Sequence, residues 1–281
     1  MSGSVNSMYS KSKFNTRTII GLGLLTAIVV VLQLIGATIR FGTFSVSLVL
    51  MPIVVGAALY GAGAGAWLGF VFGIIVLISG DAQLFMGIDA FGTIVTVLAK
   101  GILAGALSGL VYTALAKLFS KSLATERFAT ILACSLMILG GCAAWSFGLK
   151  LNHTVYEDAE QAAAMAKSSK FCIIFGAILA AVGLVLLLYV LIKRPDLDIS
   201  AAVFVSAAVC PIVNTGIFLL GCRLFFFDTI KEWAGGTDVG TFMIVGLVGF
   251  NFIFELAINL ILSPAIVMII RYAQKAFGRK N

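Results

Sequence analysis

Charged residues are scarce in this chain, and their scarcity decides the class of protein. Asp, Glu, Lys and Arg make up 11% of the 281 residues, whereas 61% are hydrophobic. The mean hydropathy is +1.12. Because an ordinary soluble domain has about 25% charged residues, a water-soluble globular protein is excluded. The composition predicts an all-α integral membrane protein, since helices satisfy their own backbone groups within lipid.

Residues suited to metal or nucleotide chemistry are also scarce. The single histidine, His153, has no cysteine or acidic residue near it at zinc-ligand spacing, and the five cysteines include no CxxC pair. The glycine-rich stretch 61–69 is not followed by the Lys-Ser or Lys-Thr pair of a phosphate-binding loop. We interpret it as a surface of small residues for close helix packing. We therefore expect no enzyme activity, no metal site and no cofactor in this chain.

Long apolar runs recur along the sequence and predict about eight helices. A span of the bilayer needs about 20 residues, because a helix rises about 1.5 Å per residue. The second and third runs are short and separated only by Tyr60 and Gly61, which predicts a tight hairpin or a tilted pair. The predicted helices cover residues 18–39, 45–60, 62–79, 90–118, 127–149, 170–192, 199–222 and 242–270.

The distribution of positive charge predicts the orientation. With the N-terminus in the cytoplasm, the inner segments carry twice as many Lys and Arg residues as the outer ones, as the positive-inside rule requires. Both termini are then cytoplasmic, and the net charge of +7 reflects topology and contact with anionic lipid. The expected outer loops, with Asp81 among their acidic residues, are mildly acidic. The polar, basic start predicts that the first helix is retained and not cleaved as a signal peptide.

Two ionisable residues lie inside apolar runs. Glu255 lies in the last run, with Asn251 and Asn259 one turn away on either side, so the three share one helix face. Lys100 is the basic residue at comparable depth in an earlier run. A charge at the bilayer centre costs about 3 kcal/mol, so the pair suggests a function. The alternative is that Lys100 and Glu255 only neutralise each other.

Counting residues from the outer helix ends places several polar side chains at one level. Lys100, Asn251, Asn214 and Gln33 fall roughly 9 to 17 Å below the outer surface at the rise of an α-helix. Four helices can therefore direct polar groups at the same place. A buried lysine beside carboxamides suits a carboxylate-bearing or carbonyl-rich molecule, and pantothenate is a first candidate.

The chain resembles the S components of energy-coupling factor (ECF) transporters, the substrate-binding membrane subunits that capture vitamins and related micronutrients. The resemblance rests on the order and spacing of blocks at residues 39–46, 52–61, 99–112, 210–218 and 249–255. S components are six-helix bundles, so the two surplus helices are expected as an inserted hairpin. The implied organisation is a cytoplasmic tail (1–17), core helices 1–4 (18–119), the inserted hairpin (120–197), core helices 5–6 (198–272) and a cytoplasmic tail (273–281).

The resemblance implies substrate capture in the plasma membrane without catalysis by this chain. A transmembrane coupling subunit and two ATPase subunits would supply the energy. The implied substrate-binding residues are Lys100, Asn214, Asn251 and Glu255, joined on depth by Gln33, with Arg40, Phe41 and Phe44 in a lid after the first helix. The small residues Gly21, Gly23 and Ala27 would allow a partner to dock, although packing within the bundle explains them equally well.

A different class of function uses the same two charges. In an ion- or proton-coupled secondary transporter, Lys100 and Glu255 would exchange protons as they pair and separate. Against this reading, the halves of the sequence show no inverted repeat of broken helices, and Glu255 is the single acidic group deep in an apolar run. A structural or assembly subunit and a membrane enzyme are the remaining alternatives.

Overall fold

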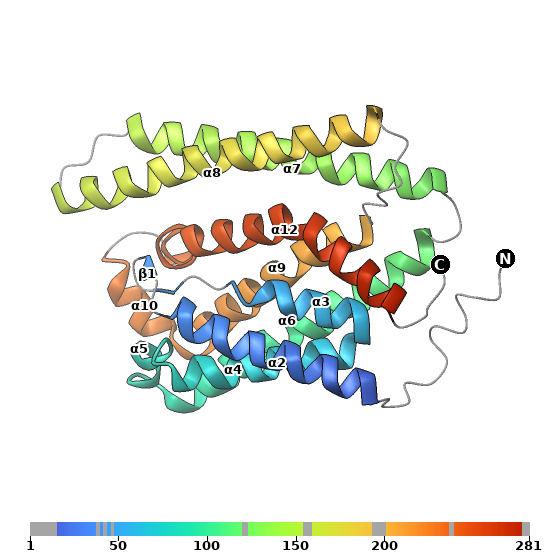
Figure 1. Ribbon diagram of the computed structural model, residues 1–281. Helices are drawn as coiled ribbons and strands as arrows, with labels where there is room; N and C mark the ends of the chain where they lie inside the picture. The colour runs from blue at the N-terminus through green and yellow to red at the C-terminus, as the bar shows by residue number, and fades with distance from the viewer. Residues whose placement is uncertain are drawn as a thin grey trace.

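The computed structural model describes residues 16–37, 40–41, 44–45, 48–119, 123–153, 159–192, 201–235 and 239–276, and these are mostly helical (Figure 1). Residues Arg40–Phe41 (β1) and Phe44–Ser45 (β2) form a short antiparallel hairpin. The helices are α2 (Thr16–Gly36), α3 (Leu50–Tyr60), α4 (Ala62–Ile78), α5 (Gln83–Met86), α6 (Ala90–Phe119), α7 (Leu123–His153), α8 (Ala159–Ile192), α9 (Ala201–Phe225), α10 (Phe227–Trp233), α11 (Val239–Thr241), the π-helix η1 (Phe242–Leu247) and α12 (Gly249–Ala276).

Four helices of the described chain are long and apolar enough to cross a membrane. Their spans are Thr18–Gly36, Ala90–Leu118, Ala201–Phe225 and Asn251–Ala273. Helices α3 and α4 are apolar but shorter. The length and composition of these helices indicate a membrane protein that crosses the bilayer several times.

Several predicted helix boundaries are wrong: the helix predicted at 127–149 covers Leu123–His153, and the last helix ends at Ala276 and not at residue 270. The second helix begins at Leu50 and not at residue 45, because Phe44–Ser45 forms β2. Helix α8 begins at Ala159, well before residue 170, so most of the predicted polar loop 150–170 is helical. Alanine has the highest helix propensity of all residues, and the run at 161–166 contains four alanines. The last predicted helix is divided, since η1 precedes α12.

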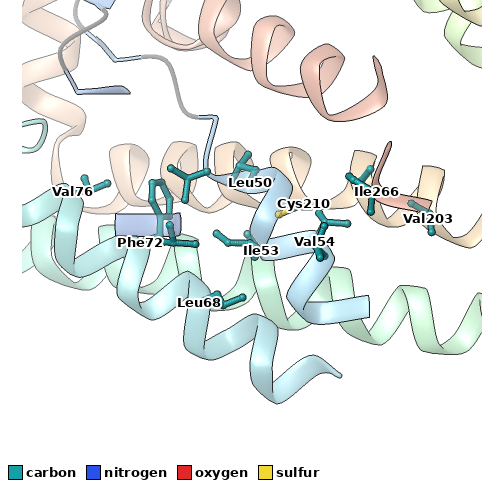
Figure 2. Packing of buried hydrophobic residues seen from close by; sticks show 14 of the residues in the cluster. Leu50, Ile53, Val54, Leu68, Phe72, Val76, Val203, Cys210 and Ile266 are labelled. Atoms are coloured by element: carbon teal, nitrogen blue, oxygen red, sulfur yellow. The ribbon is translucent and has the colours of Figure 1, made fainter. Parts of the chain in front are cut away.

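Helix α3 lies at the centre of the bundle, where it contacts α2, α4, α6, α9 and α12. Figure 2 shows Leu50 and Ile53 of α3 packed with Leu68 and Phe72 of α4, and Ile266 of α12 belongs to the same buried cluster. All five side chains are buried. An apolar helix of 11 residues is long enough here, because it fills the protein core and need not span the bilayer by itself.

Glycines serve two purposes around this core, a tight turn and close helix packing. Gly61, with φ of +93°, is the one residue between α3 and α4, as the predicted tight hairpin requires, and glycine adopts this conformation without steric cost. Along α4, a Cβ at Gly65 would overlap the carbonyl oxygen of Gly105, and one at Gly69 would overlap that of Gly101. The interpretation of residues 61–69 as a packing surface is therefore confirmed at Gly65 and Gly69, whereas a Cβ at Gly63 would meet nothing within 4 Å.

Helices α7 and α8 pack along each other as a long antiparallel pair on one side of the bundle, at the top of Figure 1. Gly141 and Gly176 face each other closely across this pair, and the Ser169 hydroxyl donates to the carbonyl of Gly148 at 2.8 Å. Helix α7 contacts α9, and α8 contacts α12. The pair thus adds a layer outside α9 and α12.

A reciprocal serine contact joins α6 to α9 inside the bundle. The two hydroxyl oxygens of Ser108 and Ser206 lie 2.8 Å apart, and each hydroxyl can reach the other residue's carbonyl oxygen, at 3.1 and 2.8 Å. Both residues are fully buried. Interhelical hydrogen bonds of this kind contribute about 0.6 kcal/mol in membranes, with a maximum of about 1.7.

We expect Ser108→Ala and Ser206→Ala to show a coupling free energy of about 1 kcal/mol in a double-mutant cycle. The two hydroxyls depend on each other, so removing the second should cost less than removing the first. Unfolding of the purified protein in detergent measures the four free energies. Strictly additive losses would show that the two serines do not interact.

Candidate ligand-binding site

A cavity lies near the end of the bundle that carries α5 and α10. This end lies opposite the start of α2 and the end of α12, on the left in Figure 1. Its walls come from α2, α4, α5, α6, α9 and α12, and from the turn after α4. The volume of this cavity is about 70 Å³.

Five of the predicted site residues line this cavity. Gln33 comes from α2, Lys100 from α6, Asn214 from α9, and Asn251 and Glu255 from α12. They come from four helices, and the bundle brings them to one cavity. Their role in binding a substrate stays a prediction.

Glu255 is the centre of a hydrogen-bond network and is 2% exposed. Its two carboxylate oxygens accept from Asn214 Nδ2 at 3.3 Å and from Asn251 Nδ2 at 3.2 Å. The amide of Asn259 donates instead to the backbone carbonyl of Glu255, at 2.9 Å, and Asn259 is not among the residues that line the cavity. Of the three residues in the predicted polar stripe, Asn251 and Glu255 therefore line the cavity, whereas Asn259 only supports the backbone of Glu255.

Lys100 projects its ammonium group between aromatic rings. The Nζ atom lies 5.4 Å from the ring centroid of Phe218 and 5.7 Å from that of Phe72, within the range of cation–π attraction. The charges of Glu255 and Asp81 also act on this ammonium. The structure thus places Lys100 and Glu255 in one electrostatic site, as their common depth suggested.

Asp81 belongs to the site although the sequence reading assigned it to an outer loop. Its carboxylate accepts a hydrogen bond of 2.8 Å from Gln33 Nε2, and it lines the cavity. Gly80, with φ of +86°, turns the chain immediately after α4. In the sequence, the glycine directly before this lone acidic residue could have indicated a turn that points Asp81 into the bundle. The direction of the side chain, however, follows only from the turn as it folds.

An aromatic wall, which sequence reading also missed, closes the side of the cavity near α5 and α10. Phe85 packs edge-on against Phe218, Phe226 and Trp233, with ring centroids 5.6, 5.0 and 5.9 Å apart. Phe85, Phe218 and Phe226 line the cavity. In an apolar sequence, a phenylalanine that lines a cavity cannot be distinguished from one that faces lipid or packs in the core. The sequence therefore offered no signal for these positions.

The other predicted residues are placed less directly. The backbones of Arg40, Phe41 and Phe44 lie in the β1–β2 hairpin, while their side chains are outside the described part of the structure. On α2, a Cβ at Gly21 would overlap the Tyr60 hydroxyl, whereas Gly23 has open space. Gly23 and Ala27 are exposed. Packing within the bundle therefore explains Gly21, and the exposed pair leaves room for a partner helix or lipid.

No family model, curated protein or solved structure matches this chain. Among the described residues, no group of three or more His, Cys, Asp or Glu side chains is placed to hold a metal ion. The chemistry of the cavity is therefore interpreted from its own side chains.

Proposed function

We propose that this chain is the substrate-binding S component of an ECF-type importer in the plasma membrane. It captures a small, water-soluble, vitamin-like micronutrient, for which the sequence favours pantothenate as a first candidate. The observation that carries the proposal is the polar cavity, where Lys100, Gln33 and Asn214 meet inside an apolar bundle. Polar groups at such depth are costly in a membrane protein and are usually functional.

The chemistry of the cavity favours binding over catalysis. An ammonium group, carboxamides and carboxylates surround one cavity, with aromatic rings on one side. Such a mixture of apolar walls and a few convergent polar groups is typical of ligand pockets. Energy would come from partners, a transmembrane coupling subunit and two ATPase subunits, which use ATP outside this chain.

The arrangement of helices supports the same proposal. Helices α2, α3, α4, α6, α9 and α12 would form the six-helix core, and α7 and α8 the inserted hairpin. With both termini in the cytoplasm, the cavity lies in the outer half of the bilayer, next to the β1–β2 hairpin that would act as a lid. The exposed face of α2 around Gly23 and Ala27 would be available to the coupling subunit.

A secondary transporter is the second candidate. The observation that favours it is that Lys100, Asp81 and Glu255 line one cavity, so a change of protonation at one charge would alter the others. In that case the chain would transport its substrate without ATPase subunits.

A thermal-shift panel tests substrate capture first. The purified chain in detergent is expected to be stabilised by one compound among pantothenate, riboflavin, folate, thiamine and biotin, because a ligand that binds only the folded state stabilises it. The gain is about 2.7 kcal/mol at a concentration of 100 times Kd. Absence of any shift would contradict capture of these vitamins.

Uptake into cells then separates the two candidates. Import of the stabilising compound should require both this chain and the coupling and ATPase subunits. Import that continues at the same rate without the ATPases would contradict the S-component proposal and favour the secondary transporter.

A further inference from the structure

The carboxylates determine which way two cavity amides point. Asn214 Nδ2 donates to Glu255, and Gln33 Nε2 donates to Asp81. An ionised carboxylate can only accept hydrogen bonds, so the NH2 group of each amide must face its carboxylate. The carbonyl oxygens, Asn214 Oδ1 and Gln33 Oε1, are then fixed as acceptors on the other side of each amide.

Neither of these oxygens has a hydrogen-bond partner among the described residues, and the same is true of Thr96 Oγ1. Gln33 is 1% exposed, and Asn214 and Thr96 are each 4% exposed. All three residues line the cavity. Buried polar atoms without partners are costly and uncommon, so a molecule that brings N–H or O–H donors into the cavity would relieve this cost.

The balance of charge in the cavity disfavours an anion. Among the described lining residues, Lys100 faces two carboxylates, Asp81 and Glu255. An anionic substrate would add a further negative charge at close range, where like charges repel strongly in a medium of low dielectric constant. A neutral substrate can still accept a hydrogen bond from the Lys100 ammonium through a carbonyl oxygen.

We propose that the substrate is a neutral molecule with an amide-, lactam- or ureido-type edge. Its carbonyl oxygen accepts from Lys100, its N–H groups donate to the oxygens of Asn214 and Gln33, and its flat apolar part packs against the wall around Phe85. The inference rests on the proposed function as a substrate-binding subunit and narrows its substrate class. It ranks such compounds above a carboxylate such as pantothenate.

Three benzene derivatives of similar shape test this recognition on the purified full chain. Benzamide carries a carbonyl oxygen and two N–H donors, benzoate carries two anionic oxygens, and N,N-dimethylbenzamide keeps the carbonyl but has no donor. At millimolar concentrations we expect benzamide to raise the Tm, and the other two to raise it much less. An equal or larger shift with benzoate or with the dimethyl compound overturns the proposal, as does the absence of a shift with benzamide.

Variants show whether the benzamide shift comes from this cavity. Asn214→Leu should weaken benzamide binding about tenfold or more, because a site with an acceptor removed loses one of its hydrogen bonds to the ligand. Asn259→Leu is the matched control, since Asn259 Oδ1 also lacks a partner among the described residues but lies outside the cavity lining. If Asn214→Leu fails to fold, Gln33→Met removes the other proposed acceptor with little change of length. Benzamide binding that is equal in wild type, the lining variant and the control overturns the proposal.

Failure of this inference and failure of the proposed function give different results. ATPase-dependent uptake together with preference for benzoate would leave the importer proposal intact and refute the neutral substrate. A benzamide shift lost in Asn214→Leu, together with uptake that needs no ATPase, would support the recognition mode and refute the S-component role.

Discussion

Replacing Lys100 by methionine is expected to weaken substrate binding about tenfold to a hundredfold while the protein still folds. The ammonium would supply a charge-assisted hydrogen bond to the substrate, and such bonds contribute about 1.5 to 3 kcal/mol. Methionine has a similar length and can keep the contact with Phe72 and Phe218, because its sulfur packs well against aromatic rings. Calorimetric titration with the compound that gives the largest thermal shift measures the loss.

Lys117→Met is the matched control for this prediction. Lys117 lies in the last turn of the same helix, α6, is exposed, and is not among the cavity residues. Its replacement should leave the affinity unchanged. If Lys100→Met binds every tested compound as tightly as the control does, Lys100 is not a substrate-binding residue, and its role is limited to balancing Glu255 and Asp81.

Replacing Gly65 by leucine is expected to lower the free energy of unfolding by about 3 kcal/mol, the upper end of the usual cost of overpacking. A Cβ at this position would overlap the carbonyl oxygen of Gly105 and lie 2.8 Å from the Cβ of Ala57. Backbone atoms cannot move aside as a flexible side chain can, so α4 and α6 would have to separate. Thermal unfolding in detergent, compared with wild type, measures the effect.

Gly63→Leu makes the same substitution two positions earlier on α4. Gly63 is exposed, and a Cβ there meets nothing within 4 Å. This variant should unfold at nearly the wild-type temperature, since leucine also has a better helix propensity than glycine. Equal stability of the two variants would show that close packing of α4 against α6 does not limit the stability of the bundle.

The overlap that Gly65→Leu would create between α4 and α6 also predicts a change in the cavity. Lys100 precedes Gly101, which packs against Gly69 on the same α4–α6 contact. Separation of the two helices would therefore displace Lys100 from the other polar residues. The contact between α4 and α6 therefore matters both for stability, through its glycines, and for the position of Lys100 in the cavity.

Sequence patterns predicted the helices well where one signal dominated. The run from Ala90 to Phe119 differs by a single residue at its end from the predicted helix 90–118, because a long apolar segment in lipid has no alternative that satisfies its backbone. The start of α8 was missed because alanines were read with their polar neighbours as a loop. The division between η1 and α12 has no simple composition signal, since both parts are apolar.

The candidate site was predictable only in part, for a similar reason. Glu255, Lys100 and the amides stand out because polar residues are rare in apolar runs, and helix geometry alone assigns them a depth. Phe85 and Phe218 do not stand out, because apolar residues surround them everywhere in the sequence. Asp81 was not recognised as a site residue, because its direction depends on the turn at Gly80 and on the hydrogen bond from Gln33.

The amino-acid sequence by itself determined that this is a helical membrane protein, roughly where its helices lie, and which polar residues are deep in them. These properties follow from composition and from the length of apolar runs, which act locally along the chain. Only the tertiary structure decided that Gln33, Asp81, Lys100, Asn214 and Glu255 surround one cavity, and which way the amides point. Those contacts join helices that are distant in sequence, so they depend on how the helices pack and not on any local pattern.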